Sequence, residues 1–267
     1  MASPFSFLGR STPDRSPQGG TAPVATGPRP DRPTYVVGDL HGRADLLEPL
    51  LRTIDADIAK IAAVSPHLVF VGNYIDHGPD SARLLTRLSA MTVEYPDNVV
   101  CLMGNHERML LDFLADPGRR GARWLRNGGA ATLRSFGVEP PPDGAGGDGY
   151  DACAKALLAV LPKPLWEWIG ARPLIWNTGN LWAVHAAADP EREMAAQSAR
   201  VLLWGHPDFA YVARRDGAWV VHGHTEVASG GVNQARISVD TGAWRTGRLT
   251  AAAIRLTGEV EFLTADG

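Results

Sequence analysis

The sequence predicts an α/β fold in which a mixed sheet is covered by helices, and two observations support this. In the first half of the chain, short apolar runs alternate with segments of helical periodicity across short joints. Such alternation is typical of right-handed βαβ units, whose parallel strands are buried on both faces. In the second half, short β-rich runs follow one another across turns, so further strands of other directions are expected.

The elements can be assigned in chain order. Parallel strands are expected at 34–38, 67–72 and 98–104, and each is followed by a helical pattern, at 43–61, 80–91 and 106–116. Most of the stretch from 106 to about 170 is expected to be helical. Two strands about a turn at 177–180 come next, and further β-rich runs lie near 218–222, 235–240, 249–256 and 259–264.

The chain divides into an arm and one folded domain. Residues 1–33 are rich in Pro, Ser and Gly and contain seven of the twenty prolines. Such a segment buries too little apolar surface to offset the entropy of ordering it, so we expect a disordered arm. Residues 34–267 are expected to form the domain, with the largely helical stretch at about 106–170 as an insert and a loop or hinge at 139–149.

Composition narrows the classes of function. The formal net charge of −3 gives no general attraction for nucleic acid polymers or acidic membranes. No apolar run approaches the roughly 18 residues of a membrane span, and the N-terminal residues lack the pattern of a secretory signal. Two cysteines cannot build a disulfide framework. We therefore expect a cytoplasmic protein whose partners are neither nucleic acid polymers nor membranes.

Potential metal ligands follow directly after the three expected parallel strands. The segments are Gly38-Asp39-Leu40-His41, Gly72-Asn73-Tyr74-Ile75-Asp76-His77 and Gly104-Asn105-His106-Glu107. Because the carboxyl ends of parallel strands meet at one edge of a sheet, these side chains are expected to lie together. Two later apolar runs end in the same way, at His185 and at His222-Gly223-His224. Mixed Asp, Asn and His ligands suit Mn²⁺, Fe or Zn²⁺ better than Ca²⁺.

These segments resemble the ordered motifs of a known family. GDLHG, GNYIDHGPDS, GNHE, the isolated His185 and HGHT are similar, in order and spacing, to motifs of the calcineurin-like metallophosphoesterases. The nearest branch is that of the bacterial serine/threonine phosphoprotein phosphatases and diadenosine tetraphosphatases. The resemblance covers residues 34 to about 256. It implies a four-layer αββα sandwich with mixed sheets and a centre of two divalent metal ions.

The resemblance also implies a role for each motif residue. Asp39 and His41 would hold the first metal, while Asn105, His185 and His224 would hold the second, and position 73 would bridge the two ions. His106 would protonate the leaving oxygen, with Asp76 orienting its imidazole. His77, Asn105 and Arg108 would contact the phosphate, although Arg108 is equally well explained as a surface residue of a helix.

Three positions depart from the family pattern. Asn73 replaces an aspartate, His77 replaces an arginine, and His206 stands where bacterial relatives often have arginine or a polar residue. A neutral amide offers one oxygen and no charge to a metal pair, and imidazole lacks the bidentate fork of arginine. We therefore expect weakened binding, with either two ions or only one held tightly. Glu226 either replaces the missing carboxylate or is a solvated loop residue.

The leading functional hypothesis is a metal-dependent phosphoesterase. Its substrate would be a phosphomonoester, as in a phosphoprotein or a small molecule, or a nucleotide-type phosphoanhydride. Water would attack phosphorus directly, without a covalent enzyme intermediate. The alternative is a catalytically impaired scaffold that binds a phosphorylated ligand or a partner protein, which Asn73 and His77 favour. An asparagine introduced at position 73 to trap substrate would explain neither His77 nor His206.

Overall fold

The computed structural model describes residues 27–61, 65–142 and 144–267, and it contains two five-stranded mixed sheets. The first has the strand order β10-β9-β1-β2-β3, and the second has the order β4-β5-β6-β8-β7. The strands of the first sheet are β1 (Thr34–Val37), β2 (His67–Phe70), β3 (Val99–Cys101), β9 (Arg248–Ile254) and β10 (Val260–Asp266). Those of the second are β4 (Ile175–Thr178), β5 (Leu181–Val184), β6 (Trp219–His222), β7 (Gly231–Asn233) and β8 (Arg236–Ser238).

Parallel pairing holds the centre of each sheet. Strands β1, β2 and β3 are parallel to one another, and β9 pairs antiparallel with both β1 and β10. In the second sheet, β5, β6 and β8 are parallel, whereas β4 and β7 run antiparallel at the edges. The predicted α/β class with mixed sheets is therefore confirmed. The short edge strand β7 was missed because its three residues, Gly-Val-Asn, carry no β-rich run.

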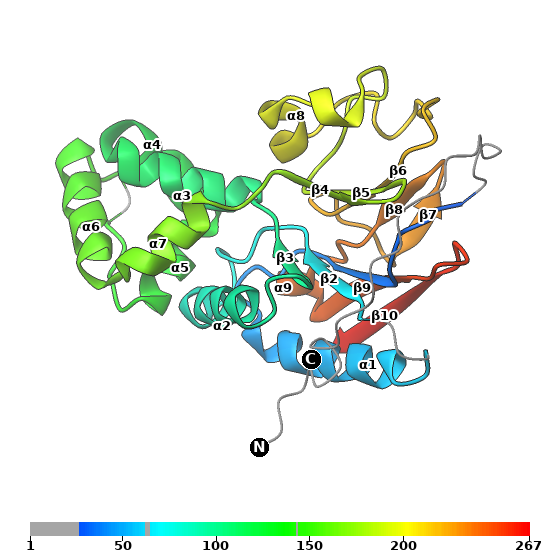
Figure 1. Ribbon diagram of the computed structural model, residues 1–267. Helices are drawn as coiled ribbons and strands as arrows, with labels where there is room; N and C mark the ends of the chain where they lie inside the picture. The colour runs from blue at the N-terminus through cyan, green and yellow to red at the C-terminus, as the bar shows by residue number, and fades with distance from the viewer. Residues whose placement is uncertain (1–26, 62–64, 143) are drawn as a thin grey trace.

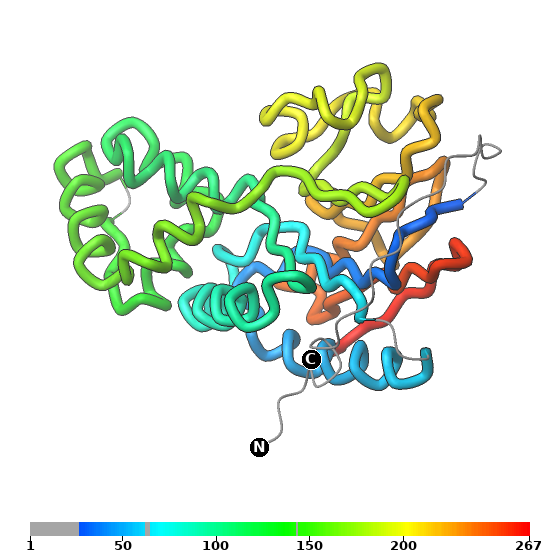
Figure 2. The backbone as a smooth tube through the Cα atoms, viewed as in Figure 1, coloured from blue at the N-terminus to red at the C-terminus, as the bar shows by residue number. Residues whose placement is uncertain are grey.

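The helices form a cover and a lateral lobe. Two of them, α1 (Ala44–Ile58) and α2 (Ser81–Glu94), cover the outer face of the first sheet (Figure 1). Between residues 105 and 170 the chain is mostly helical and forms a lobe beside the sheets (Figure 2). The lobe consists of α3 (Asn105–Ala115), α4 (Pro117–Trp124), the π-helix η1 (Leu125–Gly129), α5 (Ala130–Ser135), α6 (Gly147–Val160) and α7 (Lys163–Gly170). The remaining helices are η2 (Met194–Ala196), α8 (Ala199–Trp204) and α9 (Ala243–Thr246).

Three apolar clusters define the four layers of the molecule. On β1, the buried Tyr35 and Val37 pack with the leucines of α1 and α2, while Val36 points to the opposite face. That opposite face packs against the second sheet, so Val36 meets residues such as Val221 of β6. The outer face of the second sheet is covered by the segment 194–209, which includes η2 and α8. Successive side chains of a strand thus pack alternately against the helices on one face of the sheet and against the other sheet on the opposite face.

The first described residues differ from the prediction. Of the expected disordered arm, residues 1–26 lie outside the described residues, but residues 27–33 have fixed contacts with the β4–β5 hairpin. The Arg29 N–H donates to Asn180 Oδ1 at 2.6 Å, for example. Hydrogen bonds to this distant hairpin offset the entropy cost of ordering these residues. Composition alone does not reveal such partners, so it predicts disorder. Within the three described ranges, no helix is long and apolar enough to cross a lipid bilayer.

Candidate metal centre

The carboxyl ends of the central strands of both sheets meet at one place. The loop after β1 is tied to the loop after β2, because the N–H groups of Leu40 and His41 both donate to the Asn73 carbonyl, at 3.0 and 2.8 Å. In the second sheet, the Gly223 N–H donates to the His185 carbonyl at 2.9 Å. The His185 ring then bridges the sheets through Val71, next to β2. The expected clustering of strand ends is thus present.

Backbone conformation marks the same place. Five non-glycine residues that the sequence placed in the site have positive φ, between 42° and 73°. They are His41, Asn73, Asp76, His77 and His224. Left-handed conformations cost about 1–3 kcal/mol each for such residues, and they persist only where the surrounding structure imposes them. Their concentration at these strand ends is typical of a functional site.

Asn105 and His185 present two ligand atoms to the same point. Nδ1 of His185 lies 3.0 Å from the Val71 carbonyl, which only accepts, so Nδ1 carries the proton. Burial lowers the pKa of His185 well below its usual value, so the ring is neutral and Nε2 holds a lone pair. That lone pair faces Asn105 Oδ1 at 2.8 Å. Two electron pairs at this distance repel unless a cation lies between them, which is the arrangement of two metal ligands.

The ring of His224 completes this group. Its centroid is 5.1 Å from that of His185, and the two rings meet edge to face. Its backbone N–H points to the carboxylate of Asp39, 3.3 Å from both oxygens. The donor set of Asn105, His185 and His224 therefore fits one divalent cation.

Asp39 and His41 provide a second pair of ligand atoms, but Asn73 lies between them. Nδ1 of His41 is bonded to the Ile75 carbonyl at 2.8 Å, which leaves Nε2 free on the side of the site. The Asn73 Nδ2 group donates to Asp39 Oδ2 at 2.9 Å and lies 3.3 Å from His41 Nε2. The amide thus directs its hydrogens to the place where a first metal would bind.

Two neighbours fix this orientation of the amide. The His106 N–H donates to Asn73 Oδ1 at 3.1 Å, on the side opposite Asp39. Turning the amide would set its NH₂ group against the His106 N–H and its oxygen against the Asp39 carboxylate, giving two repulsive contacts. A bridging ion needs an oxygen on the Asp39 side, so the residues present do not fit a bridged pair of metals.

His106 and Asp76 form a buried pair beside these ligands. Nδ1 of His106 is 2.6 Å from Asp76 Oδ2, and the carboxylate is fully buried. The indole N–H of Trp124 donates to both Asp76 oxygens at 3.0–3.1 Å, and the Thr132 hydroxyl donates to Oδ1 at 2.6 Å. The carboxylate is therefore satisfied and holds the imidazole with Nε2 free. The lobe supplies Trp124 and Thr132, which sequence reasoning did not single out.

Glu107 is another residue of the site that sequence reasoning left without a role. It is fully buried, and its carboxylate accepts three backbone N–H groups at 2.8–2.9 Å, those of Asn73, Tyr74 and Gly104. It therefore joins the loop after β2 to the start of α3. Its position three residues after Gly104, in the manner of a capping box, is the signal that could have indicated this.

The sequence profile of the calcineurin-like phosphoesterases matches residues 32–228, which is well over half of the chain. The chain belongs to this family. Calcineurin-like phosphoesterases are metal-dependent hydrolases that act on phosphorylated substrates.

Individual relatives are distant. The chain is 36% identical over 77 residues to the catalytic subunit of serine/threonine-protein phosphatase 6 of Drosophila melanogaster, a match that covers 28% of this chain and 23% of that protein. A solved structure provisionally named a diadenosine tetraphosphatase has a TM-score of 0.60 at 20% identity, covering 88% of this chain and 96% of that one. The cold-active protein-tyrosine phosphatase of a Shewanella species has a TM-score of 0.55 at 16% identity, covering 87% and 80%. At such identities, these structures support the fold alone.

Two further carboxylates lie near Asp39 and affect the charge of the strand-end cluster. Asp240 is buried, and burial together with the negative charge of Asp240 raises the pKa of Asp39 well above its usual range. Glu226 accepts the indole N–H of Trp244 at 3.1 Å and pairs with Arg245. The carboxylate of Glu226 is thus engaged by neighbours on α9. The extra negative charge next to Asp39 comes from Asp240, which the sequence analysis did not single out.

The remaining predicted residues lie at different distances from the strand-end cluster. His77 stands next to His41 and His106, with ring centroids 5.0 and 5.4 Å away. Arg108 pairs with Asp112 on the next turn of α3, at 2.6 Å, as a surface helix residue does. His206 approaches Asp189 and Asp208 at 3.9–4.0 Å on a loop of the second sheet.

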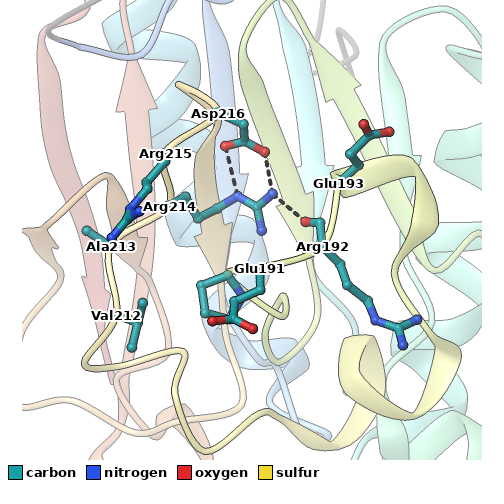
Figure 3. A pocket seen from close by; sticks show the side chains of 9 residues that line it. Glu191, Arg192, Glu193, Val212, Ala213, Arg214, Arg215 and Asp216 are labelled. Atoms are coloured by element: carbon teal, nitrogen blue, oxygen red, sulfur yellow. Dashed lines mark hydrogen bonds and ion pairs between the residues drawn. The ribbon is translucent and has the colours of Figure 1, made fainter.

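A pocket of about 510 Å³ lies apart from the strand-end cluster. It is lined by residues 190–193 and 212–216, none of which belongs to that cluster (Figure 3). Arg214 spans it, pairing with Asp216 and donating to the carbonyls of Asp189 and Arg192 at 2.7 Å. Its guanidinium is committed to holding two loops together, so this pocket adds nothing to the site.

Proposed function

We propose that the chain is a metal-dependent phosphoesterase that hydrolyses a phosphomonoester or a nucleotide-type phosphoanhydride. The observation that carries the proposal is the buried His106–Asp76 pair beside the facing ligand atoms of Asn105 and His185. A histidine held by a carboxylate next to a cation site is the arrangement required of a general acid in phosphoryl transfer. Asp76 fixes Nδ1, so Nε2 is the atom that delivers a proton.

A single tightly held cation is the form of the site that these residues favour. Asn105, His185 and His224 would hold it, and Mn, Fe or Zn suit these donors. A bound cation would neutralise charge on the phosphoryl oxygens and make nearby water more acidic. Asp39 and His41, the predicted ligands of the other metal, would bind an additional ion only weakly. The reason is that the Asn73 amide directs its N–H groups towards them.

The reaction we propose is direct displacement at phosphorus. Attack by water forms the new P–O bond as the bond to the leaving oxygen breaks. The attacking water releases one proton to solvent, and His106 transfers its proton from Nε2 to the leaving oxygen. The cysteine nearest to the site in sequence, Cys101, does not suit a covalent route. It is fully buried in β3, and burial raises the pKa of its thiol to about 12.

The substrate class that we propose is supported by the names of the relatives and by the partial exposure of His77. The names of the relatives include phosphoprotein phosphatases and a diadenosine tetraphosphatase, so a phosphoprotein, a phosphorylated small molecule or a dinucleotide would suit this chain. His77 is partly exposed at the rim, in the place where the family pattern has a phosphate-binding arginine. With an imidazole in that place, we expect weak binding of phosphate groups.

A second function is favoured by one observation. The orientation of the Asn73 amide, fixed by Asp39 and the His106 N–H, opposes the bridged metal pair. A member of the family with this feature could bind a phosphorylated ligand or partner without hydrolysing it. Turnover distinguishes the two functions.

The deciding experiment combines metal analysis with turnover of an aryl phosphate in added Mn²⁺. We expect about one tightly bound ion per chain and measurable hydrolysis. His106→Ala should keep the ion but lower kcat by about 10²–10⁴-fold, the usual contribution of a general acid. The matched control is His206→Ala, outside the cluster, which should leave both unchanged. Binding of inorganic phosphate without hydrolysis of any ester would favour the scaffold function.

A further inference from the structure

We propose that His41, His77 and His106 form a site for a borderline divalent cation such as Zn²⁺, distinct from that of Asn105, His185 and His224 and competing with Asp39 for His41. One ring nitrogen from each of the three side chains lies within 4.8 Å of the other two. Their rings meet edge to face or tilted, with centroids 4.6–5.4 Å apart. None of the three belongs to the donor set of Asn105, His185 and His224.

Two of these imidazoles are oriented as metal ligands are. Nδ1 of His41 donates to the Ile75 carbonyl at 2.8 Å, and Nδ1 of His106 donates to the Asp76 carboxylate at 2.6 Å. Histidines that bind metals almost always donate their other ring N–H to a carbonyl or carboxylate, which fixes the ring and makes the free nitrogen more basic. Nε2 of both rings is therefore the nitrogen available to a cation.

His77 supplies the third and most adjustable ligand. Its backbone is held with φ at 63° and by a hydrogen bond from its N–H to the Gly128 carbonyl at 3.3 Å. Its ring stacks on Trp244, with centroids 4.4 Å apart and planes at 21°. Among the described residues, neither ring nitrogen of His77 has a hydrogen-bond partner. The ring can thus turn within the stack towards His41 and His106 at no cost in hydrogen bonds.

The required movement is small. Zn–N bonds of about 2.0–2.1 Å in tetrahedral geometry set ligand nitrogens about 3.3 Å apart, so the cluster must contract by at most about 1.5 Å. The His41 Nε2 would exchange a contact of 3.3 Å with the Asn73 amide for the cation. Because His77 is partly exposed, a water molecule can reach the fourth position.

The donor set selects the cation. Three neutral imidazoles suit Zn²⁺, Cu²⁺, Ni²⁺ and Co²⁺, whereas Mn²⁺ and Mg²⁺ prefer oxygen ligands. The buried carboxylate of Asp76, one hydrogen bond behind His106, offsets part of the positive charge. We therefore expect this site to take Zn²⁺ or Co²⁺ in preference to Mn²⁺.

Occupancy has a consequence that rests on the proposed function. A cation here takes Nε2 of His106, the atom that delivers the proton to the leaving oxygen. Zn²⁺ at this site should therefore inhibit hydrolysis supported by Mn²⁺. The Zn²⁺ site itself does not depend on any hydrolytic activity, so binding and inhibition are tested separately.

The binding test uses metal-free full-length protein titrated with Co²⁺ and followed by visible absorption, with Zn²⁺ as competitor. His185→Gln serves as the background, because it disables the neighbouring donor set, and His224→Gln replaces it if the first variant does not fold by circular dichroism. One Co²⁺ site displaced by Zn²⁺ should remain in this background. Adding His77→Gln should weaken it at least about tenfold, whereas adding His206→Gln, as the matched control, should not.

Two results would overturn the site. One is that the His185→Gln background binds no Co²⁺. The other is that adding His77→Gln leaves the affinity for Co²⁺ unchanged, and this result would assign the ion to Asp39 and His41. For inhibition, Zn²⁺ should suppress Mn²⁺-supported turnover of the natural chain far more than that of His77→Gln. A Zn²⁺ site that depends on His77 but causes no inhibition would leave the site intact and argue against His106 as the general acid.

Discussion

At the scale of single residues, the side chain of Asn73 has the largest consequence. Its amide oxygen accepts a hydrogen bond from the His106 N–H, and its amide nitrogen donates one to Asp39. Next to it, burial and the negative charge of Asp240 raise the pKa of Asp39, and burial together with Glu226 raises the pKa of Asp240 to about 6. The amide thus stabilises the metal-free protein at the position where a bridging carboxylate would favour the metal-bound one.

Asn73→Asp should reverse this preference. One carboxylate oxygen can still accept the hydrogen bond from the His106 N–H, while the other faces Asp39 and His41 as a metal ligand. Without metal, the added buried charge should lower the free energy of unfolding by about 1–3 kcal/mol. With Mn²⁺, the variant should become more stable than the natural chain and bind a second ion. Thermal unfolding in EDTA and in Mn²⁺ measures both effects.

Asn233→Asp is the control for Asn73→Asp, because it adds the same charge at an exposed position of β7. It should change neither measurement. A variant at position 73 that is equally stable in both media would contradict the interpretation of the amide.

Asp55 gives a stability prediction that is independent of the site. Burial and the nearby Glu48 raise the pKa of Asp55 to about 6, and its Oδ1 has no hydrogen-bond partner among the described residues. Because the folded state holds the proton more tightly than the unfolded state, stability falls as the pH rises from about 4 to 6. Asp55→Asn should therefore stabilise the protein above pH 6, by about 1 kcal/mol after solvent screening, and not at pH 4.

Asp45, ten residues earlier on α1, provides the opposite case. Its hydrogen bonds from Arg43 lower the pKa of Asp45, so its stabilising effect is present at neutral pH and is lost in acid. Asp45→Asn should destabilise the protein at pH 7. Urea unfolding of both variants across pH 4–8 should show effects of opposite sign, and effects of the same sign would contradict the assignment.

At the scale of elements, the helical lobe acts on the site through Asp76. Trp124 at the end of α4 and Thr132 in α5 both donate to this carboxylate, 48 and 56 residues along the chain. The π-helix between them lies against the next loop residue, since the Gly128 carbonyl accepts the His77 N–H. The lobe therefore helps to position Asp76, and through it His106, the general acid that we propose.

Trp124→Phe tests this positioning. It keeps the ring that packs on Phe113, with centroids 4.7 Å apart, but removes the N–H from Asp76. We expect kcat to fall by about tenfold with little change in KM, because one charge-assisted hydrogen bond is worth about 1.5–3 kcal/mol. Trp168→Phe removes an equivalent indole hydrogen bond, to Thr92, elsewhere in the lobe. If both variants lower kcat equally, the effect is general loosening of the lobe and not positioning of His106.

At the scale of the whole molecule, the site exists only because the two sheets approach closely at their strand ends. A Cβ on Gly38, after β1, would lie 2.2 Å from the Val239 carbonyl, after β8. A Cβ on Gly223, after β6, would lie 2.1 Å from Asp39 Oδ1. These glycines allow the predicted ligands from one sheet to approach those from the other.

Gly38→Ala should therefore force the sheets apart. The obstacle is backbone and cannot turn aside, so we expect a loss of about 3 kcal/mol of stability and weaker metal binding. Gly170→Ala, where nothing lies within 4 Å of the new Cβ, is the control and should be nearly neutral. Urea unfolding and a metal titration measure the two effects, and a stable Gly38→Ala variant with intact metal binding would refute the close approach.

The sequence by itself determined the strands and the donors at their ends. Runs such as residues 35–37 and 68–70 are apolar and continuous because parallel strands are buried on both faces, and this is visible locally. The motifs after them placed the chain in its family and brought Asp39, Asn105 and His185 to attention. Their roles as ligands stay predictions, as does the extent of the helical insert.

Only the tertiary structure decided how these donors are used. The direction of the Asn73 amide depends on Asp39 and on the His106 N–H, 34 and 33 residues away. The partners of Asp76, the carboxylate of Asp240 and the stack of His77 on Trp244 likewise join segments far apart in the chain. A local pattern encodes which face of an element is buried, but not which distant donor meets which acceptor, because that is set by the packing of the two sheets and the lobe.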